Sequence, residues 1–211
     1  FAILTYFPAL GFPLTEPRNY FFANLLYMTV NFAVMLLIFR RTLWQSLREF
    51  EGKMLLSVLI GFGMCYGANL VLTTAYTVLD IMPENYNQEA VNSLLGGYPL
   101  AMTLCTVVLA PLAEECLFRG VLFAPLARRC LPAAYALSMF LFAGMHVFQF
   151  LGSMTAANTI LCLSLYLPAS FSLCWVYQKT GNIWACIFLH MFINFQSVLA
   201  SLLRSLMQAF L

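Results

Sequence analysis

The sequence predicts an all-α, polytopic bundle of transmembrane helices that forms one integral membrane domain over residues 1–211. The 211 residues are 63% hydrophobic and only 9% charged, whereas a soluble domain averages roughly 45–50% apolar and about 25% charged residues. The apolar residues are gathered in long uncharged runs, and a spanning helix requires about 20 such residues. A chain of this composition cannot cover itself with polar side chains, so membrane lipid is its expected surrounding.

Six windows are long and apolar enough to span a bilayer, and a longer full-length protein would have room for additional spanning helices. The third window begins near Pro99, because proline suits the first position of a helix, and it carries charged residues. In the fifth window, Pro168 is expected to kink the helix. Residues 120–129 are interpreted as an interfacial continuation of the third helix. The windows are 20–39, 54–79, the span from Pro99, 132–150, 156–177 and 183–203.

Two stretches lie outside these windows. Residues 1–12 are apolar but short and contain Pro8 and Gly11, so we expect an interfacial segment or the end of a preceding helix. Because the sequence begins at Phe1 and not at methionine, a preceding signal segment or helix is part of that expectation. Residues 80–97 are expected to form a loop.

Basic residues orient the predicted bundle, because lysine and arginine are retained in cytoplasmic loops. The loop at residues 80–97 has three acidic residues and no lysine or arginine, so it is placed on the opposite side. We expect the protein to lie in a bacterial cytoplasmic membrane. The basic residues in the alternate connections are Arg40, Arg41, Arg48, Lys53, Arg128, Arg129 and Lys179.

Charge and cysteine content exclude several classes of function. The net charge is only +2, and the basic residues form no stripe, so nucleic acid is not an expected partner. The seven cysteines are odd in number and form no CxxC pair, so we expect most to be small buried hydrophobic residues.

The informative residues are the few polar and ionisable groups within the apolar windows. Each charge at bilayer depth costs about 2.5–3.5 kcal/mol on insertion scales, and such groups generally mark functional sites. Both histidines of the protein fall inside predicted helices. Singly, each group is explained equally well as an interfacial anchor or an interhelical hydrogen bond. Together they predict one shared site, composed of Glu114, Glu115, Arg119, His146, His190 and Asn194.

Helical geometry separates the two adjacent glutamates. Consecutive residues diverge by about 100° around a helix axis, whereas residues i and i+4 share a face. We therefore pair Glu115 with Arg119 and leave Glu114 without a local cation, as suits a general base that takes a proton from water. His190 and Asn194 are also i and i+4 neighbours.

Several functions remain open at this point. A glutamate and two histidines are a familiar catalytic zinc set, so Glu114, His146 and His190 are the expected ligands if a metal is present. The sequence has no HExxH motif, and no cofactor is firmly predicted. The same residues would also suit a non-catalytic bacteriocin-immunity or binding protein, or a proton relay in a transporter, although symmetric halves are lacking.

The order and spacing of these residues resemble three motifs of the CPBP family (CAAX proteases and bacteriocin-processing enzymes, also called Abi). The resemblance covers about residues 99–195, the expected catalytic core. It implies an intramembrane endopeptidase that cleaves a peptide or protein substrate, with no information on oligomeric state. The matching motifs are Glu114-Glu115-xxx-Arg119, Phe142-xxx-His146 and His190-xxx-Asn194.

The resemblance also implies roles for individual residues. Glu114 is the expected water-activating base and His146 assists it, while His190 and Asn194 position water or hold the oxyanion. Three residues are expected to support the site structurally: Glu115, Arg119 and Phe142. Eukaryotic members remove the C-terminal tripeptide of prenylated CAAX proteins, whereas bacterial members are associated with bacteriocin maturation, immunity and peptide signalling. We expect a leader peptide or a membrane-anchored peptide as substrate.

Overall fold

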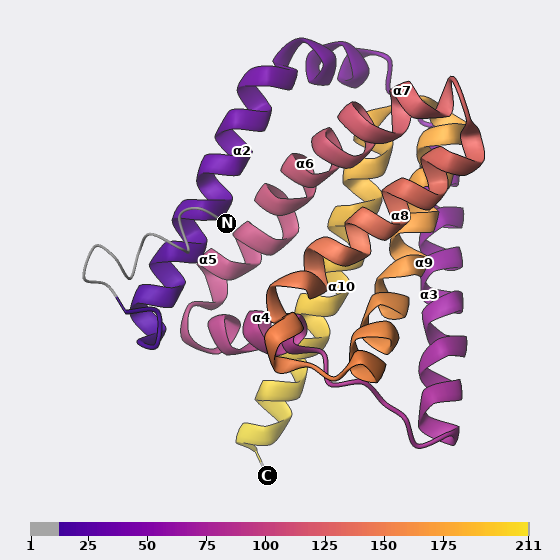
Figure 1. The fold of residues 1–211 in the computed structure, drawn as a ribbon. Helices are drawn as coiled ribbons and strands as arrows, with labels where there is room; N and C mark the ends of the chain where they lie inside the picture. The colour runs from indigo at the N-terminus through magenta and orange to yellow at the C-terminus, as the bar shows by residue number, and fades with distance from the viewer. Residues whose placement is uncertain (1–12, 211) are drawn as a thin grey trace.

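The computed structural model describes residues 13–210 as a bundle of helices in which no β-strand occurs (Figure 1). Six helical stretches within this part are long and apolar enough to cross a membrane. The predicted all-α polytopic bundle is thereby confirmed, and the chain is an integral membrane protein. The prediction for residues 1–12 lies outside the described residues. The six stretches are Pro17–Arg48, Met54–Val78, Pro99–Ala127, Leu131–Ser153, Ala156–Thr180 and Ile183–Gln208.

Several helices run further than the predicted windows. Helix α2 (Pro17–Arg48) continues past residue 39 through its basic C-terminal part, and α10 (Ile183–Ala209) continues past residue 203. Hydropathy marks only the apolar stretch of a helix, so a helix that projects beyond the hydrocarbon is underestimated. Helix α9 (Ala156–Thr180) includes a buried Pro168 without a break in the helix, and α3 (Met54–Val78) ends within a residue of its prediction.

The predicted loop at 80–97 is wrong, because it contains helix α4 (Tyr86–Gly97). The side chain of Asn85 caps this helix by accepting a hydrogen bond from the backbone N–H of Gln88, at 3.0 Å. Its side chains Leu94 and Leu95 are buried against the rest of the bundle. Helix α4 is too short and too polar for a spanning window, so the hydropathy pattern could not find it.

The third span is built from alternating regular and widened turns. Helix α5 (Pro99–Leu104) is followed by the π-helical turn η1 (Cys105–Leu109) and helix α6 (Ala110–Glu115). A second π-helical turn, η2 (Cys116–Phe123), precedes α7 (Ala124–Ala127).

Each π-helical turn ends where an Ala-Pro-Leu-Ala stretch begins, at residues 110 and 124. A proline ring inside a regular helix clashes with the carbonyl four residues earlier. In the wider turn the backbone N–H of Ala110 bonds to the Cys105 oxygen, five residues earlier, so the proline follows a turn with more room than a regular helix has. Glu114 and Glu115 therefore lie between two widened turns.

Helix α9 packs between α8 (Leu131–Val147) and α3, and α2 packs against α6. Gly61 permits the close approach of α3, because a Cβ there would lie 2.6 Å from Val176 and 2.9 Å from Leu189. Figure 1 shows α4 and the C-terminus at one end of the bundle and α7 at the other, with α8 inclined relative to α3. Six of the seven cysteines are buried as predicted, and Cys130 is exposed.

Candidate active site

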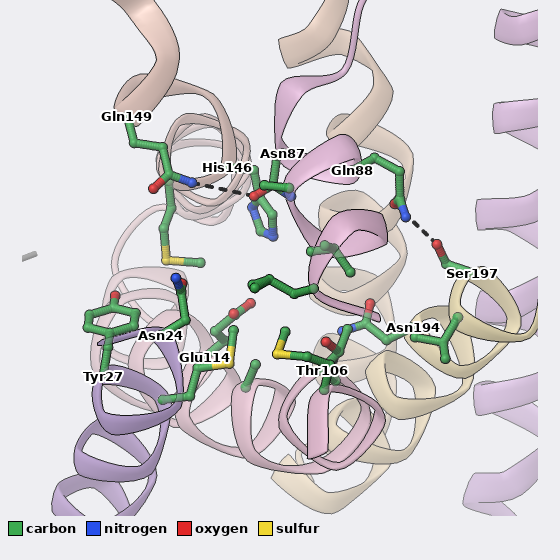
Figure 2. Close-up of a pocket in the computed structure, with 18 of the residues that line it drawn as sticks. Asn24, Tyr27, Asn87, Gln88, Thr106, Glu114, His146, Gln149, Asn194 and Ser197 are labelled. Carbon is green, nitrogen blue, oxygen red and sulfur yellow. Dashed lines mark hydrogen bonds between the residues drawn. The ribbon is translucent and has the colours of Figure 1, made fainter. Parts of the chain in front are cut away.

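A cavity of about 450 Å³ lies toward the α4 end of the bundle. Its walls come from α2, α4, the third span, α8, α9 and α10, so residues distant in the sequence meet there. Glu114, His146 and Asn194 all line it, and Figure 2 shows their side chains around the same space. The predicted convergence of these three residues is therefore present in the structure.

Behind this wall, Arg119, Glu115 and His190 form a buried chain of polar contacts. Arg119 Nη1 lies 3.0 Å from Glu115 Oε1, which is the ion pair that their spacing predicts. His190 Nδ1 contacts the same oxygen at 2.7 Å. The other terminal nitrogen of Arg119 donates to the backbone oxygen of Ser170 at 3.1 Å. Arg119 and Glu115 are completely buried, so this chain compensates charges that water does not reach.

Glu114 is held differently from its neighbour Glu115. Its side chain is 19% exposed, and its Oε2 atom lies 3.8 Å from His190 Nε2. That separation is longer than a hydrogen bond. Among the described residues, Oε2 has no hydrogen-bond partner although the atom itself is buried. Glu114 thus lines the cavity, while its buried and unpartnered Oε2 lies on the side of His190.

His146 reaches the cavity from the last turn of α8. Its Nδ1 lies 2.8 Å from the backbone oxygen of Phe142. Because a carbonyl oxygen only accepts, Nδ1 carries the proton and donates, which leaves the lone pair of Nε2 available. The ring stacks on Tyr166 of α9, with centroids 4.5 Å apart. The Tyr166 hydroxyl is fixed in turn by the side chain of Asn85, at 3.0 Å.

Asn194 donates from Nδ2 to the backbone oxygen of Thr106, at 2.9 Å. That carbonyl is available for a structural reason. In the widened turn, a backbone N–H bonds to the carbonyl five residues earlier, as Ala110 does to Cys105. In the same pattern the partner of the Thr106 carbonyl would be Pro111, which has no N–H. The π-helical turn and the proline together free the acceptor that holds Asn194.

His190 departs from the simplest prediction, because it does not line the cavity and makes its shortest contact with Glu115. Counted from the predicted starts of their helices, His146 lies farther along its helix than His190 does, so a direct contact between the two rings was difficult to predict. In the structure it is Phe142, one turn before His146, whose ring lies beside that of His190, with the two ring centroids 5.6 Å apart. His146 lies one turn further on, at the cavity.

Some residues of the site were not predicted. Tyr166, Thr106 and Ser170 contact the predicted residues, yet their types are common in membrane helices and carry no motif. Helix α4 is joined to three spans through amide and hydroxyl groups, including Ser197 to Gln88 at 3.2 Å. The sequence signal for these contacts of α4 is the group of four amide side chains within residues 85–92.

The zinc site predicted as an alternative would use Glu114, His146 and His190 as its ligands. Within residues 13–210, no three His, Cys, Asp or Glu side chains are grouped so that they could hold a metal ion together. His146 and His190 each use Nδ1 for a contact with another group, the Phe142 carbonyl and the Glu115 carboxylate. Nε2 of each ring takes no part in these contacts, and an Nδ1 contact of this kind is also what orients a metal-ligating histidine.

Residues 96–196 match the model of a family described as type II CAAX prenyl endopeptidase Rce1-like. A relative in Bacillus subtilis (strain 168), named "Putative membrane peptidase YdiL", is 28% identical over 166 residues, which cover 76% of this chain and 64% of the relative. The chain thus spans less than two thirds of that relative. No solved structure matches. The resemblance to CAAX-type membrane proteases is confirmed over the segment that carries all three motifs.

Proposed function

We propose that this protein is an intramembrane endopeptidase in which Glu114 activates a water molecule to hydrolyse a peptide bond. The observation that carries the proposal is the Glu114 carboxylate, whose Oε2 has no hydrogen-bond partner among the described residues, in the wall of a cavity that His146 and Asn194 also line. The match to CAAX-type endopeptidases and the named membrane peptidase relative support the same class of reaction.

In the first step, water in the cavity gives a proton to Glu114 while its oxygen bonds to the substrate carbonyl carbon. The lone pair of His146 Nε2 accepts a hydrogen bond from that water and orients it. The carbonyl oxygen becomes an oxyanion, which needs a donor. Asn194 uses one amide N–H on Thr106 and has a second available for the oxyanion. A donor at this position typically contributes about 2.7–4 kcal/mol to the transition state.

In the second step, Glu114 returns the proton to the amide nitrogen, the carbon–nitrogen bond breaks, and the two products are an amine and a carboxylic acid. His190 lies behind Glu114 and fixes its surroundings, because Glu115 holds the Nδ1 side of the ring. Arg119 neutralises Glu115, which keeps a second negative charge away from the reacting carboxylate.

We expect the change Glu114→Gln to lower peptide cleavage by at least about 100-fold, since an amide cannot take up the proton of water. The measurement is hydrolysis of a membrane-inserted peptide by purified protein in proteoliposomes. Glu89→Gln is the matched control, because it makes the same chemical change at an exposed residue of α4 and should leave the rate unchanged. Cleavage at the normal rate by Glu114→Gln would refute the mechanism.

The same variant separates the enzyme from a non-catalytic immunity or binding protein. If protection against a bacteriocin is the activity and no peptide is cut, Glu114→Gln retains that protection, because the amide preserves the shape of the site. A bacterial leader peptide or a membrane-anchored peptide is the substrate class proposed here, in the cytoplasmic membrane. The bacterial origin of the named relative supports that setting.

A further inference from the structure

The walls of the cavity carry negative charge but no permanent positive charge. Glu114 is the acidic residue among the side chains that line it, and no lysine or arginine lines it within the described part of the chain. Residues 1–12 contain neither residue type. His146 lines the same space, and any charge it takes up is next to the Glu114 carboxylate.

The cations of the protein are placed elsewhere. Most lie in the segment 40–53, at Arg128 and Arg129 directly after α7, and at Lys179 in the last turn of α9. Figure 1 shows α7 at the end of the bundle opposite α4. Arg119 is completely buried and its two terminal nitrogens are taken by Glu115 and Ser170. Arg18 near the start of α2 and Arg204 near the end of α10 are exposed at the cavity end of the bundle, but neither lines the cavity. Among the described residues, no basic side chain forms part of the cavity wall.

Uncharged amides take the place of such cations. Asn24, Asn87, Gln88 and Gln149 contribute to the wall from α2, α4 and the segment after α8 (Figure 2). Side-chain amides offer donors and acceptors together, which matches the alternating N–H and C=O groups of an extended peptide. A carboxylate has only acceptors and would find no cationic partner among them.

We propose that this cavity selects an internal, uncharged stretch of peptide and rejects a peptide whose free C-terminal carboxylate lies beside the cleaved bond. The inference rests on the proposed peptidase function. Burial of a carboxylate without a cation is unfavourable, and the like charge of Glu114 adds to it. The C-terminal tripeptide of a prenylated CAAX protein brings such a carboxylate, so these proteins are the disfavoured class.

The test uses one library of ten-residue peptides in two forms, with a free C-terminal carboxylate and with a C-terminal amide. Wild-type protein in detergent micelles is incubated with each form. Mass spectrometry then identifies each cleaved bond and its distance from the C-terminus. We expect the amide form to be cut at least about tenfold faster wherever the bond lies within three residues of the C-terminus. Farther from the C-terminus, the two forms should be cut equally.

Each other outcome has a definite meaning. Equal or faster cleavage of the free-carboxylate form close to the C-terminus overturns the selectivity while leaving the peptidase intact. Cleavage of neither form by wild-type protein, or of both by Glu114→Gln, overturns the proposed function and the inference with it.

A charge variant provides a second readout on the same library. Gln149→Lys adds a cation to the wall at a residue whose hydrogen bond to Asn87 is long, at 3.5 Å. We expect it to raise cleavage of the free-carboxylate form near the C-terminus by about tenfold relative to the amide form. Gln208→Lys, at an exposed residue near the end of α10, is the matched control and should leave the ratio unchanged. An unchanged ratio in Gln149→Lys contradicts the proposal.

Discussion

Glu114 and Glu115 are neighbours in the sequence, but α6 turns them toward different surroundings. Each glutamate has one oxygen without a hydrogen-bond partner, but the other oxygen of Glu115 is held by Arg119 and His190, whereas the Glu114 carboxylate borders the cavity. The angular separation of adjacent helical residues predicts this division of roles. It does not predict that His190 would bond to Glu115, because that contact depends on how α10 packs.

The Arg119 ion pair gives a prediction about stability. We expect Arg119→Met to lower the free energy of unfolding by about 3–5 kcal/mol, because it leaves the buried Glu115 charge without its cation. Unfolding in mixed micelles at increasing SDS fraction, followed by tryptophan fluorescence, measures this change. Arg204→Met is the control at an exposed position and should shift stability by less than about 0.5 kcal/mol.

A double variant tests the cause. Glu115→Gln combined with Arg119→Met removes both charges, so the loss should be smaller than for Arg119→Met alone. If the double variant were the less stable of the two, charge compensation would not explain the burial of this pair.

At the scale of elements, the third span shows how two prolines can shape a helix without ending it. Both Ala-Pro-Leu-Ala stretches follow a π-helical turn, but only the first borders the cavity. The turn before Pro111 frees the Thr106 carbonyl, and Asn194 bonds to it. A local irregularity of one span thereby fixes a side chain of another.

This relation predicts different effects for two identical substitutions. Pro111→Ala restores an N–H that competes for the Thr106 carbonyl, so Asn194 loses its partner and cleavage should fall by about tenfold. Pro125→Ala makes the same change within α7, away from the cavity, and should leave the rate close to wild type. Steady-state cleavage by each folded variant decides the matter, and equal rates for both would count against the role of this turn.

The elements also show where sequence reasoning succeeds. Long apolar runs fix the six spans because the bilayer imposes a minimum length. Helix α4 escaped prediction since it is short, polar and stabilised by amide contacts with other helices, including Tyr166 and Ser197. The same limit applies to the site: motif residues on regular helices could be predicted, whereas Tyr166 and Thr106 became visible only through tertiary packing.

For the whole molecule, the distribution of basic residues predicts an orientation that the protein itself can report. Cys130 is the exposed cysteine and lies beside Arg128 and Arg129 at the α7 end. We expect a membrane-impermeant maleimide to label it in inverted membrane vesicles but not in intact cells. Glu89→Cys in α4, on a Cys130→Ser background, should give the reverse pattern. Labelling of Cys130 from outside would invert the assigned topology.

The position of the buried ion pair has a consequence for biogenesis. Glu115 and Arg119 lie one turn apart on the same span, so they can neutralise each other as soon as that span becomes helical. This pairing lowers the cost of placing these two charges in the membrane before α8, α9 and α10 are present. Glu114 acquires its histidine neighbours only when those later helices are in place, so the polar wall of the cavity is the last part of the bundle to be completed.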